Sequence, residues 1–296
     1  MKTGGEKMDT EKDMACCAPG CCGGAATKTA TAEASGGKAI PDEASGHDEA
    51  ERVKTAVRAH YGALAEGTNQ GAGPGCCDDG GACFAGDYSA LPGHEPSADL
   101  GLGCGLPTEA ADLRPGETVV DLGSGAGNDA FVARALVGES GRVIGVDMTE
   151  AMVAKAKRNN AKLAFANVDF RLGEIEDLPI RDGLADVVIS NCVLNLVPDK
   201  ARAFSEAYRV LKPGGRLAVS DIVLSGPLPE SLRMDLEAYC GCIAGAWPRE
   251  DYLDGLQAAG FAKVEVIREQ EIPLPEAYGG KSGKAVSITL RAEKKG

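Results

Sequence analysis

The sequence has few aromatic residues and no long apolar run, and each shortage narrows the classes of protein that it can encode. Phe, Trp and Tyr together make up 4% of the 296 residues. The longest apolar runs fall far short of the roughly 20 residues that a membrane-spanning helix needs. The first residues, MKTGGEKMDTEKD, also lack the apolar core of a signal peptide. We therefore expect no membrane association and a cytoplasmic location.

Positive charge is also scarce. The chain has 31 Lys and Arg against 44 Asp and Glu, which gives a formal net charge of −13. Binding to nucleic acid needs a basic face that neutralises phosphates, and the sequence shows none, so we expect no nucleic-acid partner. A hydrophobic content of 44% is enough for a core. The length corresponds to one large domain, or to one domain with appendages.

Cysteine, in contrast, is abundant, with eleven residues in the chain. Without a signal peptide, thiols for metal binding or catalysis are favoured over structural disulfides. A zinc site is the conservative alternative, but no two cysteines have C-x-x-C spacing, which ranks it lower. The cysteines are Cys16, Cys17, Cys21 and Cys22 in CCAPGCC, Cys76, Cys77 and Cys83 in GCCDDGGACF, and Cys104, Cys192, Cys240 and Cys242.

Two N-terminal segments differ in composition. Residues 1–47 are rich in Ala, Gly, Thr, Lys and Glu, which predicts a disordered tail. Its cysteine pairs suit a soft metal or metalloid, or they belong to an unselected flexible tail. In residues 48–117, apolar residues at helical spacing predict a helix from Asp48, followed by a Gly-rich loop containing Cys76, Cys77 and Cys83.

The stretch from Thr118 to Gly127, TVVDLGSGAG, predicts a strand, a tight turn and the start of a helix. Glycines let the backbone turn sharply and approach a ligand, and the helix start offers free N–H groups. A dinucleotide fingerprint would need glycine where the chain has Asn128. The motif DxGxGxG from Asp121 instead resembles the first motif of class I methyltransferases, which use S-adenosylmethionine.

The next predicted strand, RVIGVDMT, ends at Asp147, about 20 residues after the last of these glycines, the offset at which a carboxylate binds ribose hydroxyls. The alternative is that Asp147 merely caps the following helix. A carboxylate at the strand end also suits a cationic ligand better than a phosphate. These features favour a ligand that carries a ribose and an ammonium group.

Strands and helices then alternate, which predicts an α/β fold with a doubly wound, mostly parallel sheet and ligands above the carboxyl ends of the strands. We assign residues 118–223 to this core, and 224–296 to an insert followed by completion of the sheet with a hairpin-like last strand. Seven strands in this arrangement are typical of class I methyltransferases. Asn191 and Cys192 follow the strand ADVVIS and should lie at the ligand edge, although Cys192 could equally pack as a small hydrophobe.

Two further cysteine positions are informative. Cys104 lies between two glycines, just before a short predicted helix that Thr108 could cap, and a helix N-terminus favours the thiolate. In the insert, Cys240 and Cys242 are two residues apart and would point to nearly opposite sides of a helix. We therefore expect only one of these two to be a ligand.

Taken together, the motifs resemble those of the microbial arsenite methyltransferases over residues from about 53 to 270. The motifs are VVDLGSGAGNDAF, GRVIGVDMT, FRLGEIEDLP, ISNCVLNLVPDK, YRVLKPGGRLAVSDI and CIAGA. The resemblance implies that Cys104, Cys192 and Cys242 capture trivalent arsenic, with Cys76 or Cys77 as a further participant. It implies methylation of arsenite and of methylated trivalent arsenicals, with the thiolate-bound arsenic as nucleophile, in arsenic detoxification.

The same resemblance implies a cofactor and a co-substrate. S-adenosylmethionine is the expected methyl donor, and thioredoxin or glutathione the expected thiol reductant. Glu174, Ile175 and Glu176 should lie along the adenine, and Met148 should pack on its face. The full set of expected cofactor residues is Asp121, Gly123, Ser124, Gly125, Asp147, Met148, Gly173, Glu174, Ile175, Glu176 and Asn191.

Two other functions are compatible with parts of the pattern. A methyltransferase acting on a small organic molecule would share the generic motifs, but it would leave the cysteines at ligand edges unexplained. A non-enzymatic metalloid-binding protein would account for CCAPGCC, but not for complete cofactor motifs. Analysis of the arsenic species formed from arsenite, S-adenosylmethionine and a thiol would separate these functions.

Overall fold

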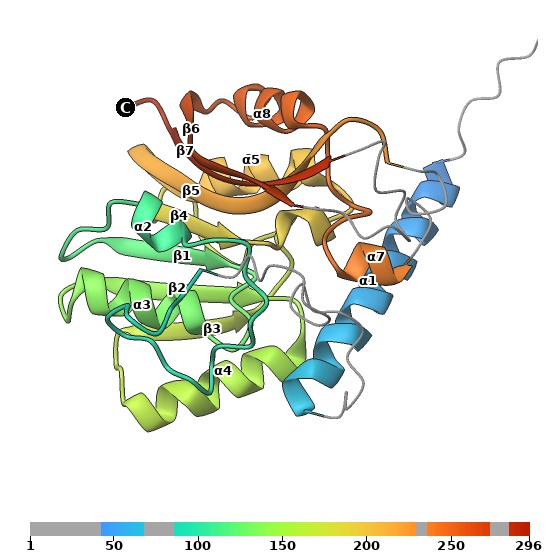
Figure 1. Ribbon diagram of the computed structural model, residues 1–296. Helices are drawn as coiled ribbons and strands as arrows, with labels where there is room; N and C mark the ends of the chain where they lie inside the picture. Colours follow the sequence, from blue (N-terminus) through green and yellow to red (C-terminus); the bar gives the residue numbers. More distant parts are fainter. Residues whose placement is uncertain (1–42, 68–85, 229–235, 273–283) are drawn as a thin grey trace, which may run out of the picture. The chain divides into compact units, whose positions relative to one another are not determined.

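The computed structural model describes residues 43–67, 86–228, 236–272 and 284–296, which belong to one compact unit, Asp42–Gly296 (Figure 1). The predicted tail lies almost wholly outside the described residues, as do CCAPGCC and the loop with Cys76, Cys77 and Cys83. Helix α1 spans Glu43–Glu66 and so begins a few residues before the expected start at Asp48. Within the described part of the chain, no helix has the length and apolar character needed to cross a bilayer.

Seven strands form one sheet in the order β3-β2-β1-β4-β5-β7-β6. The first five are parallel to one another, and β7 runs antiparallel between β5 and β6. This confirms the predicted class I methyltransferase fold, including the hairpin-like last strand. The strands are β1 (Thr118–Leu122), β2 (Arg142–Asp147), β3 (Val168–Leu172), β4 (Ala185–Asn191), β5 (Leu211–Ser225), β6 (Ala262–Ile272) and β7 (Lys284–Glu293).

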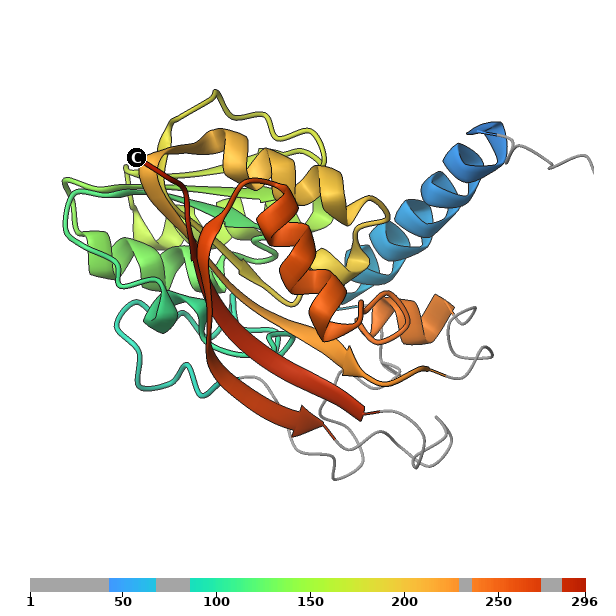
Figure 2. The same cartoon turned by 90° about the horizontal axis from the view of Figure 1, so that it is seen from above.

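Helices cover both faces of the sheet (Figures 1 and 2). Successive strand residues face opposite layers, so Val119 packs with α2, α3 and α4, and Val120 packs with α5 and α8. Both valines are fully buried, as the central strands of a doubly covered parallel sheet require. The helices are α2 (Pro107–Ala110), α3 (Asn128–Val137), α4 (Glu150–Leu163), α5 (Lys200–Val210), α7 (Leu236–Cys240) and α8 (Arg249–Ala258).

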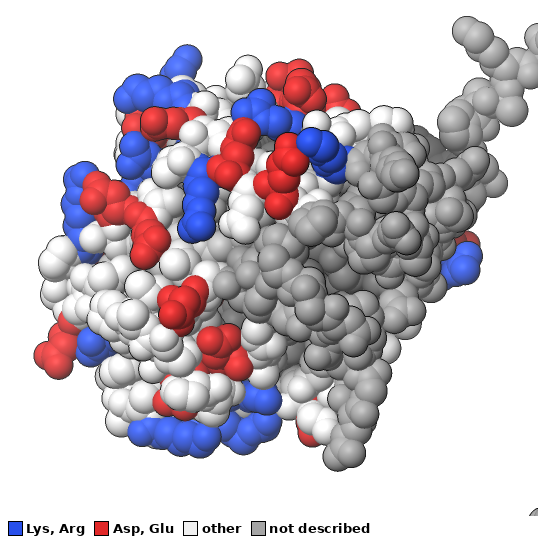
Figure 3. Space-filling view, viewed as in Figure 1, with Lys and Arg blue, Asp and Glu red and all other residues white. Residues whose placement is uncertain are grey.

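Strand β5 begins with an irregular segment. Pro213, Gly214 and Gly215, which are typical turn residues, lie within its bounds, where the pairing with β4 shifts register between Ala185 and Val187. Gly214 has a φ of 76°, so this segment is an irregular start of the strand. At the other side of the sheet, the edge strand β6 is mostly exposed and rich in charge, which protects it against pairing with another chain. Basic and acidic side chains are interspersed over the face shown in Figure 3.

Helix α1 and the insert lie at one end of the sheet. Figure 1 shows α1 beside α7, and α1 also contacts α4. The short 3-10 turn η1 (Leu194–Leu196) follows β4 and contacts α7. The carboxyl ends of β1, β2 and β4 thus face a space bounded by α1, η1 and the segment around residue 100. This is the edge at which the sequence placed the ligands.

Candidate active site at the carboxyl edge of the sheet

A cavity lies above the ends of β1, β2 and β4. One side of it consists of α1 residues and of the segment Ala98–Gly103. The other side consists of the glycine turn, the ends of the strands and the residues after β4. Of the expected site residues, those that line it are Asp121, Gly123, Ser124, Gly125, Asp147, Met148, Ile175, Glu176, Asn191 and Cys192. The fold therefore brings most of the sequence-predicted set around one space.

Two glycines shape the floor of this cavity. Gly123 has a φ of 65°, and a Cβ at this position would collide with the side chain of Val193. Gly125 has a φ of 51°, and a Cβ there would meet nothing within 4 Å, so its backbone faces open space. The Gly125 N–H donates to Asp147 Oδ2 at 2.9 Å. Glycine is thus needed at 123 for packing and at both positions for the left-handed backbone, which leaves the turn accessible to a ligand.

Asp147 ends β2 at the cavity, and backbone groups fix its carboxylate. Oδ1 accepts from the Thr149 N–H at 2.8 Å, while Oδ2 accepts from Gly125. Burial raises the pKa of Asp147, although these hydrogen bonds oppose the shift. Each carboxylate oxygen has a further lone pair available, so the group can still accept from hydroxyls of a ligand.

Asp121 and Asp129 add to the negative character of the cavity. Asp121 is 2% exposed, and its Oδ2 has no hydrogen-bond partner among the described residues. Burial, together with the nearby charges of Asp129 and Asp147, raises the pKa of Asp121 well above its usual range. Burial also raises the pKa of Asp129 to about 6, against hydrogen bonds from Asn191 and Tyr88. A buried carboxylate is costly unless it meets a cation, so these carboxyl groups fit a ligand with a sulfonium and an ammonium group.

Of the four expected residues in the loop after β3, two line the cavity and two do not. Ile175 and Glu176 line the cavity, as expected of residues along an adenine. Glu174 instead pairs with Lys54 at 2.6 Å and with Arg58, both from α1. Gly173 donates its N–H to the Asp147 carbonyl, and a Cβ at this position would press on Pro179. Glu174 and Gly173 therefore support the shape of the loop from outside the cavity lining.

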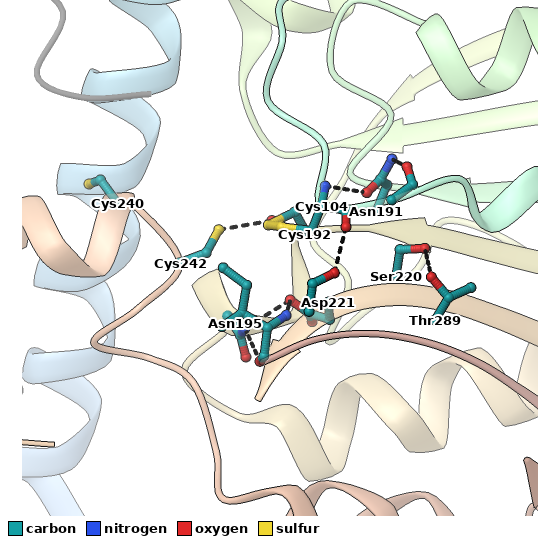
Figure 4. The surroundings of a disulfide bond; sticks show 12 residues. Cys104, Asn191, Cys192, Asn195, Ser220, Asp221, Cys240, Cys242 and Thr289 are labelled. Atoms are coloured by element: carbon teal, nitrogen blue, oxygen red, sulfur yellow. Dashed lines mark hydrogen bonds between the residues drawn. A yellow bond between two sulfur atoms is a disulfide. The ribbon is translucent and has the colours of Figure 1, made fainter. Parts of the chain in front are cut away.

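Cys104 and Cys192 meet beside the cavity, although they are 88 residues apart in sequence. The structure joins them in a disulfide with a Cα–Cα distance of 5.4 Å, as Figure 4 shows. This Cα–Cα distance lies within the range that a disulfide spans. The pair must be reduced before both sulfurs can hold a ligand.

Cys242 lies next to this pair and Cys240 does not. The Cys242 thiol donates to the Cys192 carbonyl at 3.0 Å. Figure 4 shows Cys242 directed towards Cys192, and Cys240 directed away from it towards α1. The structure therefore brings together Cys104, Cys192 and Cys242, the three cysteines that the resemblance indicated. Both cysteines of the insert are buried.

The backbone at two of these cysteines is unusual. Cys192 has a φ of 56° and Cys242 a φ of 64°, which places both in the left-handed region that L-residues other than Gly, Asn and Asp seldom adopt. Such conformations cost about 1–3 kcal/mol each and occur preferentially at functional sites. Here they turn both side chains towards the same point. Nothing in the local sequence indicated this.

Asn191 lines the cavity and also makes hydrogen bonds within the protein. Its Oδ1 accepts from the Cys104 N–H at 2.9 Å, and its Nδ2 donates to the Tyr88 hydroxyl at 2.7 Å and to Asp129 Oδ2 at 3.0 Å. The Tyr88 hydroxyl in turn donates to Asp129 Oδ1 at 2.7 Å. Asn191 thus fixes the loop of Cys104 against the strand that precedes Cys192. Sequence reasoning missed Tyr88, which lies in none of the quoted motifs, and Asp129, which lies within VVDLGSGAGNDAF but was assigned no role.

A second buried network fixes the turn after Cys192. The Asn195 amide donates to Asp221 Oδ1 at 2.8 Å, and the Tyr252 hydroxyl donates to Oδ2 at 3.2 Å. Burial raises the pKa of Asp221 to about 7. Burial likewise lowers the pKa of Lys200 to about 8, although the negative charges of Asp221 and Cys242 act in the opposite direction and raise it. The network ties η1 to β5, and so limits the movement of Cys192.

The predicted cap at Thr108 is wrong. Helix α2 begins at Pro107 with no side-chain cap, and the buried Thr108 hydroxyl has no hydrogen-bond partner among the described residues. Helix α2 has only four residues, so its dipole can do little to stabilise a thiolate at Cys104. The Cys104 carbonyl instead accepts from Ser287 Oγ of β7 at 2.6 Å. The position of Cys104 thus depends on Asn191 and Ser287, from two distant strands.

Comparisons with known proteins agree with this geometry. Residues 113–271 match the family described as "Methyltransferase domain". Two curated proteins named arsenite methyltransferase are similar to the chain. That of Halobacterium salinarum is 50% identical over 202 residues, which cover 67% of this chain and 52% of that protein. That of Aquipseudomonas alcaligenes is 37% identical over 237 residues, which cover 75% and 65%.

Among solved structures, CrArsM, an arsenic(III) S-adenosylmethionine methyltransferase from Chlamydomonas reinhardtii, superposes with a TM-score of 0.59. It is 40% identical to the chain and covers 65% of it, while the chain covers 68% of CrArsM. The fold and site thus define a class I methyltransferase. Within that class, the chain belongs to the arsenite methyltransferase family. It spans about half to two thirds of the length of the curated relatives named above.

Proposed function

We propose that this protein methylates trivalent arsenic, with S-adenosylmethionine as methyl donor and Cys104, Cys192 and Cys242 as arsenic ligands. The observation that carries the proposal is the convergence of these three cysteines, from three separate segments, at the edge of the acidic cavity. Trivalent arsenic is soft and pyramidal, so three thiolates suit it. Two of the three cysteines adopt a costly backbone conformation that aims them inward, which a purely structural role would not need.

The cavity residues divide the task of holding the methyl donor. Asp147 would accept from ribose hydroxyls, and Met148, Ile175 and Glu176 would line the adenine. The negative field of Asp121 and Asp129 would favour the cationic end of the donor. When bound, S-adenosylmethionine supplies a methyl group activated by a sulfonium. The protein contributes by holding the two reactants in register and excluding water, an effect worth up to about 7–11 kcal/mol in favourable systems.

A thiol reductant is part of the proposal. Arsenic needs both Cys104 and Cys192 as thiolates, and the structure has them in a disulfide. Thiol–disulfide exchange with a dithiol such as thioredoxin, or with two molecules of glutathione, would break the S–S bond and leave both cysteines reduced while the reductant is oxidised. The Cys77 or Cys76 thiol, outside the described residues, is a further proposed participant. We also propose a role in arsenic detoxification.

The test is an analysis of products with matched cysteine variants. Reduced protein is incubated with arsenite and S-adenosylmethionine, and methylated arsenic species are separated and identified. We expect methylated arsenicals from the native protein and from Cys240→Ser, but not from Cys242→Ser. Cys240 is the control, because it lies two residues away, is equally buried and points away from the other cysteines. Equal loss of activity in both variants would contradict the ligand assignment.

A further inference from the structure

Helix α1 touches both halves of the site through one of its faces. Lys54, Val57 and Tyr61 follow one another at helical spacing and all line the cavity. Arg52, Thr55 and Ala59 lie on the exposed side of the same helix. Helix α1 lies outside the residues that match the methyltransferase domain, so the general chemistry of that family gives it no role.

Lys54 holds the loop on the cofactor side. Its ammonium pairs with Glu174 at 2.6 Å and with Glu176 at 3.1 Å, and its side chain is only 11% exposed. Burial lowers the pKa of Lys54, but hydrogen bonds to the two glutamates and their charges outweigh burial and raise it. The two glutamates flank Ile175, which lines the cavity. Lys54 therefore fixes both sides of the segment expected along the adenine.

Tyr61 reaches the metalloid side from about 10 Å further along the same helix. Its hydroxyl donates to the Cys240 carbonyl at 3.0 Å. This carbonyl belongs to the turn in which the Cys242 N–H donates to the Tyr239 carbonyl at 2.9 Å and the Cys242 thiol reaches Cys192. In Figure 4 the turn with Cys240 lies against α1. Tyr61 therefore fixes the segment that presents the third thiol.

We infer that Lys54 and Tyr61 are positioning residues, and that α1 sets the loop Glu174–Glu176 and the turn Cys240–Cys242 relative to each other. A ligand that orders one of these segments also orders α1 and, through it, the other segment. Cofactor and arsenite should therefore bind with positive coupling, each tightening the other by the same factor. The inference rests on the proposed function, because it takes arsenite as the second ligand.

The experiment measures arsenite affinity by calorimetry with and without saturating S-adenosylhomocysteine, which occupies the cofactor site without transferring methyl. The full chain is used with a phosphine reductant, so that Cys104 and Cys192 are thiols and no competing thiol is present. In the native protein we expect S-adenosylhomocysteine to tighten arsenite binding about fivefold or more. A factor of about five is the lower end of common coupling factors. The reverse titration should give the same factor.

The variants separate positioning from loss of folding. Lys54→Met and Tyr61→Phe should each reduce the coupling factor to below about twofold, the latter by removing one hydroxyl. Lys54→Arg should restore coupling, because it keeps the charge opposite the two glutamates. Arg52→Met removes one positive charge, as Lys54→Met does, but from the exposed face of α1. This variant should leave the coupling factor unchanged.

The outcomes distinguish a failure of the role proposed for α1 from a failure of the proposed function. If the native protein binds both ligands with a coupling factor near one, or if both Lys54→Met and Tyr61→Phe retain full coupling, α1 does not connect the half-sites and this inference is overturned. If the reduced native protein binds no arsenite, either with or without S-adenosylhomocysteine, the proposed function itself fails. Thermal unfolding of each variant, followed by circular dichroism, shows whether a reduced coupling factor results from unfolding of the protein.

Discussion

Asp129 should make cofactor binding depend on pH in a way that reports the charge of the ligand. Its carboxyl is buried, has a pKa of about 6 and lies at the cavity near Asp121 and Asp147. S-adenosylmethionine carries a positive sulfonium, whereas S-adenosylhomocysteine has a neutral sulfide at the same place. The ionised form of Asp129 attracts the first more than the second. The ratio of the two affinities should therefore rise as pH increases through 6.

The size of the effect follows from the titration. At pH 5 about one Asp129 in eleven is ionised, and at pH 8 nearly all are, so affinity for the sulfonium compound should be about tenfold weaker at pH 5, or about 1.4 kcal/mol. Burial also raises the pKa values of Asp121 and Asp147, which increases the change at the acid end. Tenfold is the largest change that Asp129 alone can cause over this pH range, because the calculation assigns no attraction to its protonated form.

The assay is calorimetric titration of both ligands from pH 5 to pH 8, with the native protein and two variants. Asp129→Asn should flatten the pH dependence of the affinity ratio near pH 6. Asp254→Asn, at an exposed position on α8, should leave it unchanged. A ratio that stays constant over this range in the native protein, or a profile that is the same in Asp129→Asn, would refute the electrostatic reasoning.

Three further predictions concern other parts of the site. Asp147→Ala should weaken cofactor binding by about 1.5–3 kcal/mol for each lost charged hydrogen bond while leaving arsenite binding nearly intact, and calorimetry giving unchanged cofactor affinity would refute the assignment. Asn191→Ala should lower the free energy of unfolding by about 1–3 kcal/mol, because it leaves the Cys104 N–H without its acceptor and removes the amide that donates to the Tyr88 hydroxyl and to Asp129, and urea titration measures this. Deleting residues 1–41 should leave turnover at saturating arsenite within a few-fold, with a reduced rate only at low arsenite. A truncated protein that folds and binds cofactor but never methylates would place CCAPGCC in the active site.

The sequence by itself determined the sheet and the cofactor edge. Alternating layers of apolar strands and amphipathic helices are local patterns, and they are sufficient to predict the parallel sheet. The glycine turn from Gly123 and the strand end at Asp147 are also local, because strand, turn and helix start are set by neighbouring residues. The separation of Cys240 from Cys242 was expected from helical spacing, but α7 ends at Cys240 and Cys242 lies in the following turn, so the turn and not the helix sets their directions.

Only the tertiary structure decided how the site is assembled. The disulfide between Cys104 and Cys192, the contacts of Asn191 with Cys104 and Asp129, and the pairing of Lys54 with Glu174 all join residues at least 60 positions apart. The left-handed backbone at Cys192 depends on packing that no local preference favours. Local periodicity predicts elements because each is stabilised by its own neighbours, whereas contacts between distant segments depend on how the whole chain packs.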